Sequence, residues 1–197
     1  PPESHSRAGS EENFTTPYWL EEPAQLGIYS VEDQALIGLP ETPKPIQFTY
    51  TFSIEGQTYS LTKPLIYKYN DPVKGEVYEN FKILPKASVS LQESVYIFKN
   101  SQEKTLGIKV KALTSKLLGE LTLNLPETWK ITPESHPVQI NNKGEEQTFE
   151  FRIKPSSHSE VSLTPELRID GDVLDKTVTT IDYDHIGTHN LVERSTV

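Results

Sequence analysis

Two histidines near the end of the chain have a spacing that could bind a metal ion. His185 and His189 are separated by three residues, and on a helix this spacing would place two imidazoles on one face. Gly187 and the alternating pattern of the preceding residues argue against a helix, and no glutamate lies between the histidines. We therefore favour a solvated segment over a metal site here.

Two aspartates beside this histidine pair are candidates for acid and base chemistry. In Asp182-Tyr183-Asp184-His185 the alternation of a strand would place both carboxylates on one face. A carboxylate pair can divide the roles of acid and base only in an enclosed site that separates the two pKa values. A terminal strand provides no such enclosure, so we expect the end of a strand that leads into a linker.

Other catalytic and cofactor motifs are missing from the sequence. Cysteine is absent, which excludes disulfides, cysteine-ligated zinc, iron–sulfur clusters and thiol nucleophiles. The sequence contains neither a Gly-x-Ser-x-Gly elbow nor a phosphate-binding glycine-rich loop. Asp170-Gly171-Asp172 resembles part of a calcium loop, but Asp-Gly is also typical of a tight hairpin turn, and we favour the turn. Asn13-Phe14-Thr15 fits the glycosylation sequon.

Exposed aromatic side chains could stack on sugar rings. The candidates for contact with a glycan or with a neighbouring domain are Phe14, Tyr18, Trp19, Tyr67 and Tyr69. Because apolar, irregular segments usually pack on another surface, we favour contact with a neighbouring domain for these five residues.

A second tryptophan follows a predicted strand end. Trp129 comes three residues after Pro126, so it can fold back and close the open end of a sandwich. We assign Trp129 and Pro126 structural roles, and ligand stacking by Trp129 is the alternative.

Composition narrows the class of partner. The 197-residue chain has 19 Lys and Arg against 28 Asp and Glu, which gives a formal net charge of −9. Nucleic acids and anionic membranes attract clustered basic side chains, so we expect neither as a partner. No apolar stretch approaches the roughly 20 residues of a membrane-spanning helix. The chain lacks methionine and begins with Pro1-Pro2, and we interpret it as a piece of a longer polypeptide.

The first half of the sequence predicts a tether followed by an irregular β module. Residues 1–13 are polar and are expected to be disordered or a tether. In residues 14–85, a short helical turn with Ser30 as its cap precedes alternating residues from 46 to 54, which predict a half-buried strand and a hairpin at Glu55-Gly56. Asp71 and Gly75 are assigned structural roles in a later turn.

The second half predicts an immunoglobulin-like sandwich over residues 86–184. Seven or eight short strands separated by turn residues in about 100 residues are typical of that fold. The expected strands are 88–91, 94–98, 105–112, 119–125, 138–140, 147–154, 162–169 and 175–183. Residues 185–197 are expected to be a linker or tail. The predicted class is therefore all-β, with two β-sandwich-like modules of which the second is immunoglobulin-like.

Several stretches together resemble one bacterial architecture. They are 14–20 (FTTPYWL), 31–40 (VEDQALIGLP), 63–76 (KPLIYKYNDPVKGE) and 181–186 (IDYDHI). They look like the region that follows the catalytic domain in large LmbE-like (PIG-L family) deacetylases. Residues 86–184, with the Leu-Pro-x-x-Trp piece, are similar to the NEW3-type immunoglobulin-like domain found beside glycoside hydrolases.

This resemblance implies an accessory role. In that family a zinc-dependent amidase domain removes acetyl groups from N-acetylglucosamine-type sugars through a His-Pro-Asp-Asp or Ala-His-x-Asp-Asp motif, and this sequence contains no such motif. The resemblance implies no catalytic or metal residue in this segment, zinc in the catalytic domain of the same parent chain, and a periplasmic or extracellular location. We therefore expect a non-catalytic module that orients or docks onto that catalytic domain. A carbohydrate-binding module is the alternative.

Overall fold

The computed structural model describes residues 14–22, 26–98, 102–156, 160–183 and 187–197, and these are almost entirely β. The chain divides into unit 1, Pro1–Ile83, and unit 2, Leu84–Val197. The predicted all-β, sandwich-like class is confirmed. The boundary lies two residues before the expected one at Pro85-Lys86.

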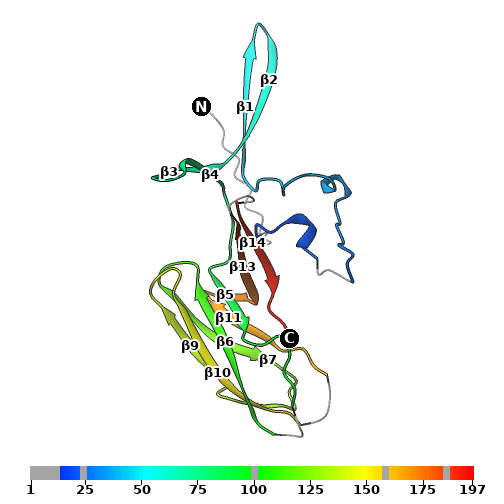
Figure 1. Ribbon diagram of the computed structural model, residues 1–197, viewed down its shortest axis with the longest axis vertical. Helices are drawn as coiled ribbons and strands as arrows, with labels where there is room; N and C mark the ends of the chain where they lie inside the picture. The colour runs from blue at the N-terminus through cyan, green and yellow to red at the C-terminus, as the bar shows by residue number, and fades with distance from the viewer. Residues whose placement is uncertain (1–13, 23–25, 99–101, 157–159, 184–186) are drawn as a thin grey trace. The chain divides into compact units, whose positions relative to one another are not determined.

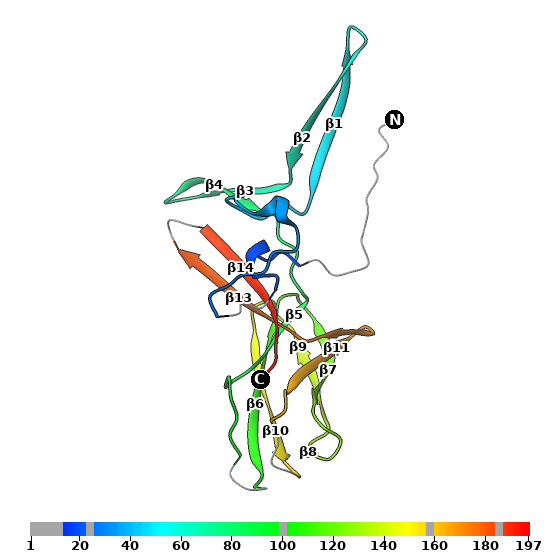
Figure 2. The same ribbon diagram turned by 90° about the vertical axis from the view of Figure 1, so that its right-hand side faces the viewer.

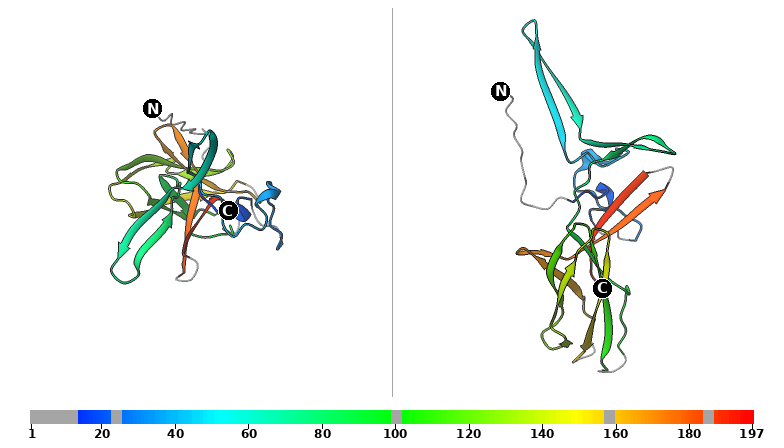
Figure 3. Two further views of the ribbon diagram at one scale, coloured as in Figure 1. Left: turned by 90° about the horizontal axis from the view of Figure 1, so that it is seen from above. Right: turned by 90° about the vertical axis from the view of Figure 1, so that its left-hand side faces the viewer.

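Unit 2 contains two four-stranded antiparallel sheets, which face each other in Figure 3. The first has the order β5-β6-β10-β8 and the second β12-β11-β7-β9. Their bounds are β5 Ala87–Leu91, β6 Lys104–Ala112, β7 Leu117–Asn124, β8 Lys130–Thr132, β9 Ser135–Ile140, β10 Glu146–Lys154, β11 Thr164–Ile169 and β12 Asp172–Leu174. In an immunoglobulin domain the first, second, fifth and fourth strands form one sheet in that order, and β5, β6, β10 and β8 match them. In the other sheet the third strand pairs with the sixth and the sixth with the seventh, as β7 pairs with β11 and β11 with β12. Unit 2 is therefore immunoglobulin-like, with β9 added at the free edge of β7.

The core of unit 2 follows the alternation of its strands. On β7, Leu117, Leu121 and Leu123 are buried, while Glu120 and Asn124 are exposed. The same period of two appears on β10, where Phe151 and Ile153 alternate with exposed charged residues. The inner faces thus supply a filled apolar interior, and the outer faces carry the charge.

The last residues of the chain are part of unit 2. Strand β13 (Lys176–Tyr183) forms a hairpin with β14 (Gly187–Arg194). After β14, Val197 exchanges two backbone hydrogen bonds with Leu163, of 2.6 and 3.1 Å. The expected linker or tail over 185–197 is therefore wrong for residues 187–197, because their backbone groups pair with β13 and with Leu163. Residues 185 and 186 lie outside the described part.

Tight turns occur where the sequence predicts them. Glu55 and Gly56 both have positive φ, 51° and 77°, in the hairpin of β1 (Gln47–Ile54) and β2 (Gln57–Pro64). Asp170 and Gly171, at 53° and 95°, connect β11 to β12 in the same way. Such two-residue turns match the twist of the strands they join.

Unit 1 has a different arrangement from unit 2. Its strands form two separate two-stranded sheets, β1–β2 and the hairpin of β3 (Ile66–Asp71) with β4 (Gly75–Asn80). Figures 1 and 2 show β1–β2 as a long twisted ribbon. Two packed sheets were expected in this module, but the described residues of unit 1 place neither hairpin in a larger sheet.

Two short 3-10 helices precede these hairpins, η1 (Tyr18–Leu20) and η2 (Gln34–Leu36). The cap of η2 is Asp33, whose side chain accepts the backbone N–H of Ala35 at 2.9 Å. Ser30 was the expected cap, and the helix begins three residues later because Asp33 provides the acceptor.

One expected strand in unit 2 has no ladder partner. Along residues 94–98 exposure still alternates, with Tyr96 and Phe98 half-buried and Val95 and Ile97 exposed. The pairing of β5 with β6 ends with the hydrogen bond from Gln92 N–H to Gly107 O, so the following segment leaves the sheet. Strands β8, β12 and β14 were not among the expected strands.

Candidate interaction surface

The histidine and aspartate candidates form no metal cluster in the described part of the chain. His185 and Asp184 lie outside it. Asp182, near the end of β13, accepts a hydrogen bond from the hydroxyl of Thr188 at 3.0 Å, and His189 is the next residue of β14. Among the described residues no three His, Asp or Glu side chains are placed to share a metal ion.

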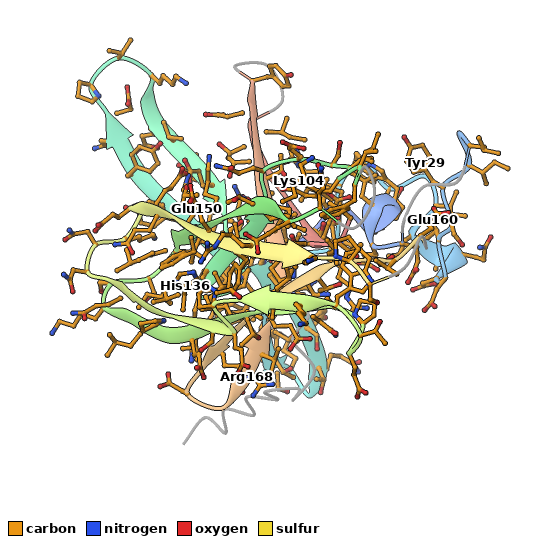
Figure 4. All side chains as sticks on the ribbon, turned by 90° about the horizontal axis from the view of Figure 1, so that it is seen from below. Tyr29, Lys104, His136, Glu150, Glu160 and Arg168 are labelled. Carbon is orange, nitrogen blue, oxygen red and sulfur yellow. The ribbon has the colours of Figure 1, made fainter. Side chains whose placement is uncertain are left out.

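His136 has a structural environment at the edge of the sandwich. Its Nε2 lies 2.9 Å from the carbonyl oxygen of Glu150 on the facing sheet, and both residues are labelled in Figure 4. The imidazole also packs against Phe149 and Phe151, with ring centroids 5.5 and 4.8 Å away. This histidine therefore links β9 to β10.

Trp129 is buried, with 7% of its surface exposed. Its backbone N–H donates to the carbonyl of Pro126 at 2.9 Å, which forms the turn that brings the ring back toward the sandwich. Phe98 contacts the ring edge-on at 5.5 Å. Little of the indole face is left for a ligand.

The first aromatic residues of unit 1 are tied to later segments of that unit. Tyr18 is buried; its N–H donates to Thr42 Oγ1 at 2.9 Å and its hydroxyl to the carbonyl of Leu39 at 3.2 Å. Its ring meets that of Trp19 edge-on at 4.9 Å. Phe14 and Trp19 are half-buried. Of the five predicted contact residues, Tyr18 is therefore not available to a partner.

A segment after η1 exposes large apolar side chains. They are Leu26, Ile28, Tyr29, Ile37 and Leu39, all more than 40% exposed. Tyr29 is labelled in Figure 4. Acidic residues lie between them at Glu32 and Asp33. We call these five side chains the 26–39 patch.

The β1–β2 hairpin has one apolar face and one hydroxyl face. In the observed register Tyr50 lies opposite Leu61 and Phe52 opposite Tyr59, whose rings stack with centroids 5.8 Å apart. The apolar ladder consists of Phe48, Tyr50, Phe52, Ile54, Tyr59 and Leu61, which are 46–56% exposed. On the other face Thr49 and Thr62 are hydrogen-bonded through their hydroxyls at 3.0 Å. The sequence predicted this alternation, but we expected the apolar side to be half-buried within the module.

This exposure sets unit 1 apart from unit 2. Tyr18 is the one buried hydrophobic side chain among the described residues of unit 1, whereas the other buried hydrophobic side chains of the described chain belong to unit 2. Monomeric proteins rarely expose large contiguous apolar patches unless these bind something. The strongest candidate site is therefore a set of interaction surfaces on unit 1.

The β3–β4 hairpin carries tyrosines on both faces. Tyr67 and Tyr69 share one face, with ring centroids 5.5 Å apart and planes tilted by 30°. The hydroxyl of Tyr69 donates to Glu79 Oε1 at 3.1 Å, and this hydrogen bond raises the pKa of Tyr69 above its usual value. The structure thus places an exposed Tyr67 ring beside a second ring and a carboxylate.

The opposite face of this hairpin has its own polar network. Lys68 Nζ lies 2.7 Å from Glu76 Oε1, and the hydroxyl of Tyr78 donates to Glu76 Oε2 at 2.8 Å. The hydrogen bond from Lys68 lowers the pKa of Glu76, and the one to Glu76 raises the pKa of Lys68. In the connecting turn Asp71 Oδ1 accepts the N–H groups of Val73 and Lys74 at 2.8 Å each.

The two residues assigned structural roles in this turn have clear local functions. The pKa of Asp71 is lowered mainly by the hydrogen bond from the backbone N–H of Lys74, and next by the one from Val73, because both favour the charged carboxylate. Gly75 has a φ of 78°, a conformation that favours glycine. Asp71 and Gly75 therefore begin and end the turn between β3 and β4.

A comparison of the sequence with known protein-family models finds no match, and a comparison with curated protein sequences finds none either. Within the described residues there is no helix with the length and apolar character needed to cross a bilayer.

The sequence showed that both segments are apolar, but sequence reasoning did not predict that their side chains are exposed to solvent. The signal for the β1–β2 face was present, because aromatic residues alternate with Thr and Ser over residues 47–54. A period of two shows that a strand is amphipathic and does not show what covers it. The 26–39 patch has no regular period, and the sequence showed only that the irregular apolar segment 14–39 needs a surface to pack on, without showing which of its side chains are exposed.

Proposed function

We propose that this chain is a non-catalytic accessory module of a larger bacterial N-acetyl-sugar deacetylase, and that unit 1 docks it onto the catalytic domain of the same parent chain. The observation that carries the proposal is the exposure of the 26–39 patch. Apolar side chains at that level of exposure gain free energy when a partner covers them.

The sandwich of unit 2 supports an orienting role. Its inner faces are filled by side chains such as Leu106, Ile108 and Phe151, each fully buried. A filled core keeps a module rigid, and rigidity is what a spacer that orients an enzyme needs. The resemblance to the region after the catalytic domain of LmbE-like enzymes supports the same role and a periplasmic or extracellular location.

The docking proposal predicts a direct interaction with an LmbE-like catalytic domain. Binding of the chain to that separately produced domain would be measured by calorimetry. Ile28→Glu and Ile37→Glu should each weaken binding by at least tenfold, because each places a charge in an apolar contact. Ala35→Glu lies in the same exposed segment and adds the same charge without removing a large apolar side chain, so it should leave binding unchanged.

The result that would overturn docking is equal binding by all three variants, or no binding by the unchanged chain at millimolar concentration. The parent enzyme should also lose activity toward N-acetyl sugars when the 26–39 patch is altered, while the isolated chain with zinc should form no product. Turnover by the isolated chain would contradict the non-catalytic assignment.

A carbohydrate-binding module is the second candidate, and the arrangement on β3–β4 favours it. The Tyr67 ring, beside Tyr69 and the Glu79 carboxylate, offers an aromatic face next to a hydrogen-bond acceptor. Titration with N-acetylglucosamine oligomers should then give heat that Tyr67→Ala abolishes. Tyr78→Ala changes an equally exposed ring on the other face of the same hairpin and should retain binding. Absence of heat at millimolar oligomer removes this candidate.

A further inference from the structure

The β1–β2 hairpin has a feature that the 26–39 patch lacks, which is an apolar face with a regular period along two paired strands. Its six large side chains alternate along two paired strands of eight residues each. Among the described residues β1 and β2 pair only with each other. An isolated two-stranded hairpin is marginally stable in water and needs further strands or a packed face. This hairpin therefore requires a partner that covers its apolar side.

The charges of the hairpin indicate what that partner is. Residues 47–64 contain one acidic residue, Glu55, and one basic residue, Lys63. Glu55 is in the turn, whereas Lys63 lies opposite Phe48 at the other end of the apolar face. The hairpin is thus neutral in a chain of net charge −9, and it is a surface on which two copies can approach without strong repulsion.

We propose that the apolar face of β1–β2 is a dimerisation surface that packs against the same face of a second copy of this chain. The two hairpins lie antiparallel about a two-fold axis that passes near Tyr50 and Phe52. In that arrangement Glu55 of each copy comes next to Lys63 of the other, because the turn of one hairpin meets the open end of its partner. The interface is isologous, with the same residues contributed by both copies.

The area of the face fits a dimer of modest affinity. Six side chains that are about half exposed offer roughly 600 Å² per copy, if each large side chain presents up to about 200 Å². Two copies together would bury about 1,200 Å², at the lower end of specific interfaces. We therefore expect a dissociation constant of about 1–100 µM. This inference is independent of the proposed docking to a catalytic domain, which uses the 26–39 patch.

Sedimentation velocity across about 1–500 µM of the full chain tests the dimer directly. The unchanged chain should convert from monomer to dimer over this range. Tyr50→Lys and Phe52→Lys should remain monomeric, because each places a charge in the centre of the apolar face. Thr51→Lys adds the same charge between them on the hydroxyl face, and it should dimerise as the unchanged chain does.

Charge exchange tests the antiparallel arrangement. Glu55→Lys and Lys63→Glu should each weaken dimerisation by about threefold or more, as expected for loss of an exposed ion pair and gain of a like-charge contact. The double variant Glu55→Lys/Lys63→Glu restores opposite charges across the two-fold axis and should recover the original dissociation constant. A double variant as weak as the single ones would overturn the antiparallel packing.

Cross-linking gives a second measurement, which reports how the two hairpins are arranged in the dimer. Because the chain has no cysteine, a mixture of Glu55→Cys and Lys63→Cys proteins should form a mixed disulfide on oxidation. Glu55→Cys alone should cross-link poorly, since the two turns lie at opposite ends of the interface. Efficient cross-linking of Glu55→Cys to itself would contradict the arrangement.

Three outcomes would overturn the proposal as a whole. A chain that remains monomeric at 500 µM has no such dimer. Equal effects of Thr51→Lys and Tyr50→Lys would show that association does not use the apolar face. Species that grow beyond a dimer would indicate strand pairing along the edges of the hairpin. In each case docking through the 26–39 patch could still be measured, so the two proposals fail separately.

Discussion

Phe98 packs edge-on against Trp129, with ring centroids 5.5 Å apart and ring planes at 76°. Phe98 belongs to the segment that leaves the sheet after β5, and Trp129 to the turn before β8. The contact therefore joins two connecting segments that come from different parts of the sandwich. Edge-to-face pairs of this kind contribute about 0.5–1.5 kcal/mol beyond the area they bury.

Replacing Trp129 by alanine should therefore destabilise unit 2. We expect a loss of about 3–5 kcal/mol in the free energy of unfolding, because a large aromatic ring is removed from a packed position. Val95→Ala, in the same segment as Phe98 but two-thirds exposed, should cost less than about 0.5 kcal/mol. Urea denaturation followed by circular dichroism measures both. A Trp129→Ala protein of unchanged stability would contradict the packing role.

The core alternation on β7 gives a second prediction with a control on the same strand. Leu121 is fully buried and Leu118 is 60% exposed. Leu121→Ala should lower the free energy of unfolding by about 2–5 kcal/mol through the cavity it leaves, and Leu118→Ala should change it by about 0.5 kcal/mol or less. Similar losses for the two variants would mean that the face assignment of β7 is wrong.

The immunoglobulin-like unit was predictable from sequence because the apolar residues of its alternating strands are also the residues that the structure buries. In β7 from Leu121 and in β10 from Phe149 every second residue is apolar, and the inner face is covered by the other sheet, so the period of two gives both the strand and its buried side. Turns such as Asp170-Gly171 were predictable because positive φ restricts the residue types. The short strands β8 and β12 were missed, since three residues are too few to establish a period.

Unit 1 was less predictable for a physical reason. Phe48, Tyr50 and Phe52 give the same pattern as a core strand, but what covers them is not encoded in the strand itself. The cap of η2 is Asp33, whereas Ser30 was expected. Both residue types are good helix caps, so the sequence alone does not show which one is used. The family resemblance, the catalytic domain as partner and the location remain predictions.

The uneven burial of the two units predicts different folding behaviour. Residues 84–197 alone should unfold in one cooperative transition, because nearly all buried hydrophobic side chains of the described chain lie there. Residues 14–83 alone should show no cooperative transition, since burial of apolar surface is what offsets the loss of chain entropy. Hydrogen exchange would show strong protection in β6, β7, β10 and β11 and weak protection in β1 and β2. A cooperative transition of residues 14–83 as a monomer would contradict this account.

An exposed carboxylate on the outer face of the sandwich gives the pH prediction. Glu146 lies 3.2 Å from Lys111 Nζ and 3.5 Å from Lys109 Nζ, and the hydrogen bond from Lys111 is the main cause that lowers the pKa of Glu146 below 4.5. A carboxyl group whose pKa is lower in the folded state contributes stability above its unfolded pKa, and this contribution is lost as the pH falls through the folded value.

Lys111→Gln should therefore raise the pKa of Glu146 toward 4.5. The stability that the ionised Glu146 gives to the folded state should then be lost at a higher pH than in the unchanged chain. The chemical shift of the Glu146 side-chain carbonyl carbon, followed by NMR from pH 6 to pH 2, measures the pKa directly. Lys130→Gln removes an exposed lysine from β8 in the same sheet, at a position that does not pair with Glu146, and should leave the titration of Glu146 unchanged. Equal shifts in the two variants would show that the cause is the net charge of the sheet and not the contact with Lys111.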